Sequence, residues 1–193
     1  MPRSKNGDVD YEWSSGLIDE LRKAGFTPSQ IKHILPNILV ESGWGRADAV
    51  QGDWKQDFKG DEGGFNVGRG YIQLTGYDNY RKMEEDTGIP LTKNPKLASL
   101  PENSARIAAA YLKRRQKEFG DVQDLSYNSF ESVYRALAPK NKNPESRKKE
   151  IEKYNYRLAT DDDVLNNMPA YDPSAWTVEP DGSLRPNSTP NQR

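Results

Sequence analysis

Residues 68–76, with the sequence GRGYIQLTG, are the segment that most strongly decides the fold of this chain. Glycine occupies both ends and the third position, and it permits tight backbone turns that other residues resist. The polar residues Gln73 and Thr75 alternate with aliphatic neighbours, as in a strand that is buried on one side. The pattern predicts a short strand or extended turn over residues 67–75.

A predicted helix upstream of this segment ends in an acid. Thr27 is a good N-cap and Gln30 completes a capping box, after which aliphatic residues follow at helical spacing. Glu41 shares their inward-facing stripe in the last turn, before Gly43 ends the helix. Partial burial and the negative end of the helix dipole both favour a protonated carboxyl, which is the form that a general acid needs.

The remaining pattern predicts a mainly α domain over residues 1–160. Residues 44–66 look irregular and acidic, and residues 161–193 are rich in proline, which predicts an extended or disordered docking tail. Helical spacing and end signals predict helices over residues 10–25, 27–43, 77–87, 102–119, 129–137 and 143–158.

Composition removes several classes of function. The chain has no cysteine and one histidine, His33, which is expected at the surface or half-buried, so thiol chemistry and a histidine-rich zinc site are excluded. Neither a cofactor nor a metal site is predicted. A net charge of -1 gives no general attraction to nucleic acid, and no apolar run is long enough to insert into a membrane. The N-terminal residues show no signal peptide.

The chemistry must therefore rest on carboxylates, hydroxyls and amides. Hydrolysis of a glycosidic bond needs two carboxyl groups on opposite sides of the bond. Glu41 is the natural first member, and Glu62, in a glycine-rich acidic loop, is the candidate for the second. Asp53, Asp57 and Asp61 remain alternatives for that second position.

The chain also resembles a known family. Residues 68–76, followed by Asn79 and Tyr80, resemble the Gly-Arg-Gly-x-Ile-Gln-Leu-Ser/Thr signature and the following Asn-Tyr of glycoside hydrolase family 19. Residues 40–43 resemble the family's His-Glu-Ser/Thr segment, with valine in place of histidine. The resemblance implies a lysozyme-like fold of two helical lobes, with a short strand-and-loop region beside the cleft, and an inverting mechanism.

The resemblance also implies roles for individual residues. Glu41 would be the general acid, and Glu62 the base that holds the attacking water with the help of Thr75. Gln73 and Asn79 would form hydrogen bonds with the sugar.

Two aromatic residues have two interpretations each. Trp54 and Tyr71 are candidates for stacking against sugar rings, and the alternative is that they belong to the core. Arg69 is expected to be structural, joining the two lobes through an ion pair.

The function predicted from these residues is hydrolysis of the β-1,4 bonds of an N-acetylated glycan, with bacterial peptidoglycan as the partner and a phage lysin as the protein type. The expected location is the host cytoplasm before release to the wall, or the phage virion, where the tail would contact virion proteins. Two alternatives are a virion structural or wall-binding protein with a degenerate lysozyme-like fold, and a lytic transglycosylase. The first is favoured by the loss of the family's downstream Arg-x-Ile-Asn-Gly-Gly segment.

Overall fold

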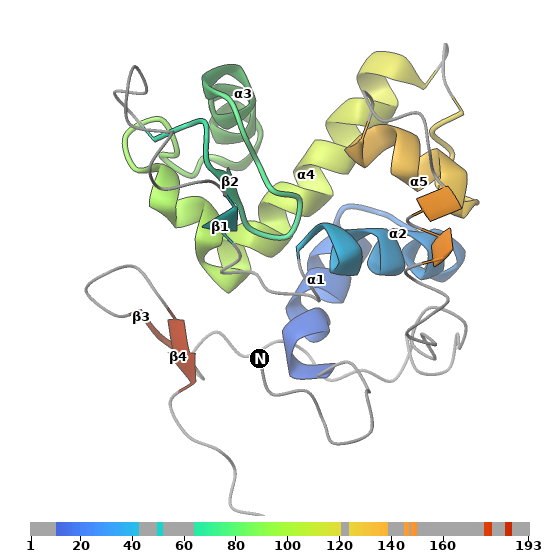
Figure 1. The fold of residues 1–193 in the computed structure, drawn as a ribbon, viewed down its shortest axis with the longest axis horizontal. Coiled ribbons are helices and arrows are strands. Elements are labelled where there is room, and N and C mark those ends of the chain that lie inside the picture. Colours follow the sequence, from blue (N-terminus) through green and yellow to red (C-terminus); the bar gives the residue numbers. More distant parts are fainter. Residues whose placement is uncertain are drawn as a thin grey trace, which may run out of the picture.

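The computed structural model describes residues 11–42, 50–51, 64–120, 124–138, 145–146, 148–149, 176–178 and 184–186. Within these ranges the protein is mainly helical, which confirms the predicted class (Figure 1). The helices are α1 (Tyr11–Lys23), α2 (Pro28–Glu41), α3 (Tyr77–Thr87), α4 (Pro101–Phe119) and α5 (Phe130–Leu137), with the 3-10 helix η1 (Pro95–Ser99) before α4.

Local sequence signals set the ends of these helices. At the start of α2 the hydroxyl of Thr27 accepts a hydrogen bond from the backbone N–H of Gln30 at 3.3 Å. The Gln30 side chain accepts one from the backbone N–H of Thr27 at 3.0 Å, which completes the predicted capping box. Gly88 ends α3 with a left-handed φ of 72°, a conformation that glycine adopts without strain.

Helix α4 lies at the centre of the molecule. It packs against α1, α3, α5 and η1, and Figure 1 shows α3 with the first strand pair toward one end of α4 and α5 toward the other. Its buried face contains Ala105, Ala108 and Ala109, whose small side chains allow neighbouring helices to approach closely.

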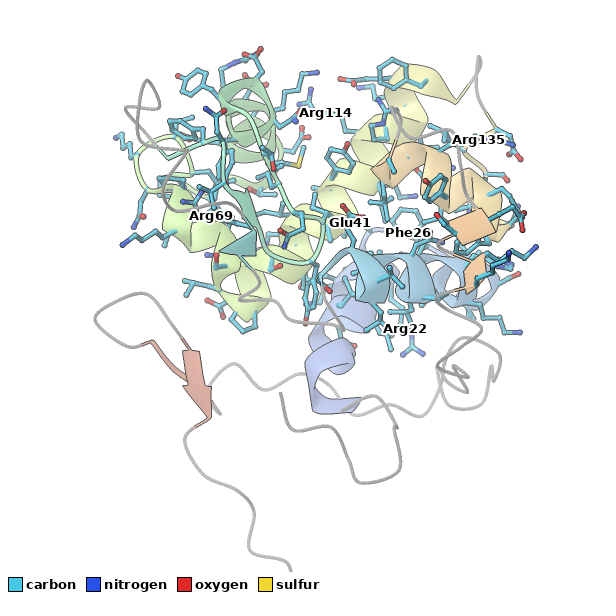
Figure 2. All side chains as sticks on the ribbon, viewed as in Figure 1. Arg22, Phe26, Glu41, Arg69, Arg114 and Arg135 are labelled. Carbon is cyan, nitrogen blue, oxygen red and sulfur yellow. The ribbon has the colours of Figure 1, made fainter. Side chains whose placement is uncertain are left out.

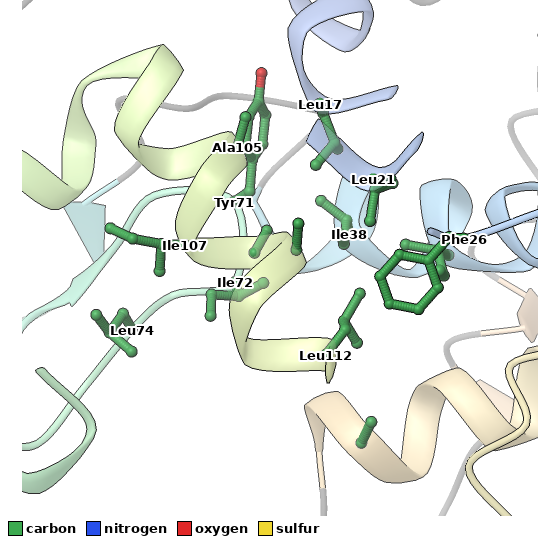
Figure 3. Packing of buried hydrophobic residues seen from close by; sticks show 14 of the residues in the cluster. Leu17, Leu21, Phe26, Ile38, Tyr71, Ile72, Leu74, Ala105, Ile107 and Leu112 are labelled. Atoms are coloured by element: carbon green, nitrogen blue, oxygen red, sulfur yellow. The ribbon is translucent and has the colours of Figure 1, made fainter. Parts of the chain in front are cut away.

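One hydrophobic cluster joins the helices to the turn that follows β2 (Figure 3). Its members come from all five α-helices, from the segments between them and from the turn at residues 71–74, so this turn is anchored in the core of the domain. The cluster includes Leu17, Leu21, Phe26, Ile38, Tyr71, Ile72, Leu74, Ala105, Ile107 and Leu112.

Helix α2 is also tied to the segment around α5. The side-chain amide of Gln30 donates to the carbonyl of Ser126 at 2.8 Å. The buried side chain of Asn37 donates to the carbonyl of Phe130 at 3.3 Å. Two hydrogen bonds about two turns apart on α2 therefore fix its position against residues 126–130.

The strands within the described ranges are short, and neither of their two pairings was predicted from the sequence. β1 (Val50–Gln51) pairs antiparallel with β2 (Gly68–Arg69), although residues 44–66 were predicted to be irregular. The short stretch pairs because β2 presents backbone groups that need partners. In the predicted tail, β3 (Trp176–Val178) pairs antiparallel with β4 (Leu184–Pro186), a hairpin that composition alone did not predict.

The last predicted helix, residues 143–158, is helical at residues 145–146 and 148–149, and its remainder lies outside the described ranges. None of the helices that the structure describes combines the length and apolar character needed to cross a membrane.

Candidate functional site

Glu41 is the last residue of α2. It is half-buried, and the neighbouring Ser42 caps the helix by donating its backbone N–H to the carbonyl of Ile38 at 2.9 Å. The last turn of α2 contains no basic residue to balance the negative end of the helix dipole. In Figure 2 the Glu41 side chain lies at the centre of the molecule, at the end of α2 and beside α4.

The charge of Glu41 affects the pKa of Tyr111 on α4. Burial is the main cause that raises the pKa of the Tyr111 hydroxyl, the positive charge of Arg115 opposes it, and the negative charge of Glu41 raises it further. The hydroxyl donates to the carbonyl of Ala136 on α5 at 3.5 Å. Tyr111 therefore joins α4 to α5 by a hydrogen bond and lies within electrostatic range of Glu41.

The segment after β2 forms a compact turn. Arg69 and Leu74 exchange two backbone hydrogen bonds, of 3.2 and 2.9 Å, and Gln73 N–H donates to the carbonyl of Gly70 at 3.2 Å. Gly70 and Gln73 both adopt positive φ, of 73° and 50°. The prediction of a short strand or extended turn at residues 67–75 is confirmed, and the left-handed conformation of Gln73 is an addition to it.

Gly70 is required by close packing as well as by its backbone conformation. A Cβ atom at this position would lie 2.5 Å from both the Ala98 carbonyl oxygen and the Ser104 hydroxyl oxygen. The same Ser104 hydroxyl accepts a hydrogen bond from the backbone N–H of Tyr71 at 2.7 Å. The turn is thus pressed against η1 and the start of α4 with no space for a side chain.

Arg69 is structural, although the contacts that define its role differ from the predicted ion pair between lobes. Its side chain is only 9% exposed. Nη1 donates to the carbonyls of Gly64 and Val67 at 2.5 and 3.2 Å, and to the hydroxyl of Tyr80 at 3.0 Å. Arg69 therefore fastens the turn to the preceding loop and to α3.

The predicted polar residues Gln73, Thr75 and Asn79 lie close together. The Gln73 amide donates to the Gly70 carbonyl at 2.9 Å, and the Thr75 hydroxyl donates to the Gln73 carbonyl at 2.8 Å. The Asn79 amide donates to the Thr75 carbonyl at 2.8 Å. A Cβ atom on Gly68 would meet the Gln73 side-chain oxygen at 2.8 Å and the Thr75 hydroxyl at 3.3 Å, so both polar groups lie over this glycine.

Tyr71 belongs to the core, which is the second of the two interpretations given for it. Its side chain is 3% exposed and belongs to the hydrophobic cluster, as Figure 3 shows between α1 and α4. Tyr71 breaks the alternation of this segment, because it is buried together with Ile72 and Leu74. It is therefore not available as a surface for a sugar ring.

Several predicted residues cannot be placed. Glu62, Trp54 and the alternative acids Asp53, Asp57 and Asp61 lie outside the described ranges.

His33 is half-buried, and burial together with the charge of Lys32 lowers its pKa. Across the described part of the chain, no three His, Cys, Asp or Glu side chains are grouped so that they could hold a metal ion.

Two contributors to this region were not found from the sequence. Tyr111 and Ser104 are far from Glu41 and Gly70 along the chain, and on a helix each looks like an ordinary packing residue. Only the folded arrangement reveals them, because no local pattern signals a contact over 30 residues or more.

No protein-family model matches this chain, and no curated protein sequence matches it significantly.

Proposed function

We propose that the protein is a glycoside hydrolase of lysozyme-like, two-lobed architecture that cleaves the β-1,4 bonds of bacterial peptidoglycan. Residues 1–160 would form the catalytic domain and residues 161–193 a docking tail. In this proposal Glu41 is the general acid and Glu62 the base, and inversion requires about 6.5–9.5 Å between their carboxyl groups.

One observation carries the proposal. Ile38, one turn before Glu41, and Ile72, next to Gln73, belong to the same hydrophobic cluster (Figure 3). The helix that ends in the acid and the turn that presents Gln73 and Thr75 are therefore anchored in one core. Two parts of the proposed site that are far apart in sequence are thus supported by one core. Catalysis needs such support, because the reacting groups must be held in a fixed geometry.

In the proposed reaction Glu41 gives a proton to the glycosidic oxygen as the bond to the leaving sugar breaks. Water attacks the anomeric carbon from the opposite face and loses a proton to Glu62. Thr75 has a defined part in this step. Its hydroxyl proton is engaged with the Gln73 carbonyl, so its oxygen orients water as a hydrogen-bond acceptor.

Asn79 and Gln73 have the sugar as their proposed partner. The Asn79 side chain is exposed and uses its amide nitrogen on the Thr75 carbonyl. Its amide oxygen would accept a hydrogen bond from a sugar hydroxyl or N-acetyl N–H.

The test is product analysis on purified cell-wall sacculi, with wild type compared with Glu41→Gln. We expect reducing sugar ends from wild type, with inverted anomeric configuration by NMR. In Glu41→Gln the rate should be lower by at least about 10²-fold, the usual contribution of a general acid. Glu102→Gln is the matched control, because Glu102 is exposed in the first turn of α4.

Each other outcome selects another function. Anhydromuramyl ends would identify a lytic transglycosylase. Sacculus binding without any product would identify a structural or wall-binding protein of a phage particle. Equal rates for wild type and Glu41→Gln would remove Glu41 from the chemistry.

A further inference from the structure

A row of three aromatic rings leads from Arg69 to the protein surface. Tyr80 is fully buried, and its hydroxyl accepts from Arg69 and donates to the carbonyl of Val67 at 3.3 Å. Phe65 packs edge-to-face against Tyr80, with ring centroids 5.2 Å apart. Phe65 also packs edge-to-face against Tyr77, with centroids 5.0 Å apart.

Hydrogen bonds also fix the backbone that carries the two outer rings of this row. Gly76 N–H donates to the carbonyl of Phe65 at 2.6 Å, which fixes residue 65 beside the start of α3. Tyr77 is the first residue of that helix, and the N–H groups of Asn79 and Tyr80 bond back to the Gly76 carbonyl at 3.0 and 3.2 Å. The ring of Tyr77 is therefore preorganised, and a ligand that uses it need not order a mobile side chain.

Tyr77 is nevertheless open to solvent. It is 52% exposed, and among the residues that the structure describes it is the only large hydrophobic side chain in the exposed class. In an edge-to-face pair Phe65 covers at most one face of the Tyr77 ring. At least one face of a rigid aromatic ring is thus left free of this partner.

The surroundings of the ring are polar. Thr75, Asp78 and Asn79 are exposed and lie within two residues of Tyr77 along the chain. An exposed aromatic face with exposed hydroxyl, carboxylate and amide residues next to it in the chain matches a pyranose, whose axial C–H groups pack on an aromatic ring while its hydroxyls form hydrogen bonds with polar groups. A protein partner would need a wider apolar patch than one ring supplies.

We propose that Tyr77 is a stacking platform for one pyranose ring of the glycan, in a subsite next to Gln73 and Thr75. The platform replaces Tyr71, which the fold buries. The identity of the sugar rests on the proposed function, whereas the aromatic platform rests on the contacts above. Two extended residues span at most about 7 Å, so the subsite adjoins the residues proposed to act on the scissile bond.

The experiment measures binding of an N-acetylglucosamine tetramer and of purified sacculi to the full chain carrying Glu41→Gln, so that turnover does not interfere. In that background, Tyr77→Ala is expected to weaken binding about tenfold, the scale of aromatic stacking on a ring-shaped ligand. Tyr77→Phe keeps the ring and should stay within about twofold of the parent. Lys96→Ala, an exposed change on η1, is the surface control.

A second measurement does not depend on how well Tyr77→Ala folds. Tyr77→Trp adds a fifth tryptophan, at the platform. The difference in emission between this variant and its parent should shift to shorter wavelength on addition of the tetramer. An unchanged emission with a bound tetramer, or equal affinities for Tyr77→Ala and its parent, overturns the proposal.

The two proposals fail separately. Binding that depends on Tyr77 without any cleavage by wild type would refute the hydrolase and keep the platform. Cleavage by wild type with KM unchanged in Tyr77→Ala would refute the platform and keep the hydrolase.

Discussion

The turn at residues 68–76 and the C-terminal end of α2 both supply polar residues to the proposed site, yet the fold uses them differently. In the turn, the side chains of Arg69, Gln73 and Thr75 all donate to carbonyls of the turn or of the loop before it. At the end of α2, a carboxyl lies where the helix dipole opposes its charge and where the last turn offers no basic residue.

The difference teaches that the most conspicuous sequence motif and the group proposed to be catalytic can have separate roles in the molecule. Most of the GRGYIQLTG signature can be understood as the requirement of one tight turn. At the end of α2 the helix cap is supplied by the backbone of Ser42 and not by Glu41. We therefore expect substitutions in the turn to cost stability first, and Glu41→Gln to cost activity while the fold survives.

The largest loss of stability is expected for Gly70→Ala. The new Cβ would lie 2.5 Å from two oxygen atoms at a φ of +73°. Strain and overpacking together should lower the free energy of unfolding by about 3 kcal/mol or more, measured by urea denaturation. Gly88→Ala is the matched control, because its φ is +72° and no atom lies within 4 Å. It should cost only about 1 kcal/mol, and equal losses at both positions would contradict the packing explanation.

The next effect is expected for Arg69→Met, which keeps much of the side-chain volume and removes every donor. Three acceptors, the carbonyls of Gly64 and Val67 and the hydroxyl of Tyr80, would lose this partner. The free energy of unfolding should fall by about 2–3 kcal/mol, measured by thermal and urea unfolding. Arg106→Met is the control, since its side chain is 55% exposed and it should change stability by less than about 0.5 kcal/mol. A stable Arg69→Met protein would show that the turn does not depend on these bonds.

The smallest effect is expected for Thr27→Ala, at the other end of the helix that carries Glu41. Loss of the capping box should lower the free energy of unfolding by about 1 kcal/mol. Because Thr27 is far along α2 from the carboxyl, the rate of glycan cleavage by the folded protein should not change. Ser29→Ala, an exposed neighbour in the same first turn, serves as the control in calorimetry. A fall in rate that exceeds the unfolded fraction would mean that the start of α2 positions Glu41.

The helices could be predicted because their signals are local. Thr27 with Gln30, and the glycines at 88 and 120, mark helix ends through interactions that span four residues or fewer. The short strand at Val50–Gln51 could not be predicted in the same way. Its pairing depends on β2, which lies 17 residues or more further along the chain.

The candidate site shows the same contrast between features set by local sequence and features set by long-range contacts. The sequence placed Glu41 at a helix end, and Gln73 with Thr75 in one turn, because spacing alone brings those residues to their elements. The sequence could not assign Tyr71 to the core and Tyr77 to the surface, since one tyrosine lies inside the motif and the other directly follows it. That assignment depends on the packing of Tyr71 in the hydrophobic cluster and of Phe65 against Tyr77.

The two hydrogen bonds from Gln30 and Asn37 to the carbonyls of Ser126 and Phe130 limit how far this protein can be shortened. A fragment that stops at Gly120 retains every residue of the signature turn, yet it removes the acceptors against which α2 is aligned. Such a fragment would carry Glu41 on a helix with a loose orientation. An engineered minimal version should therefore extend through α5, to Leu137 or beyond.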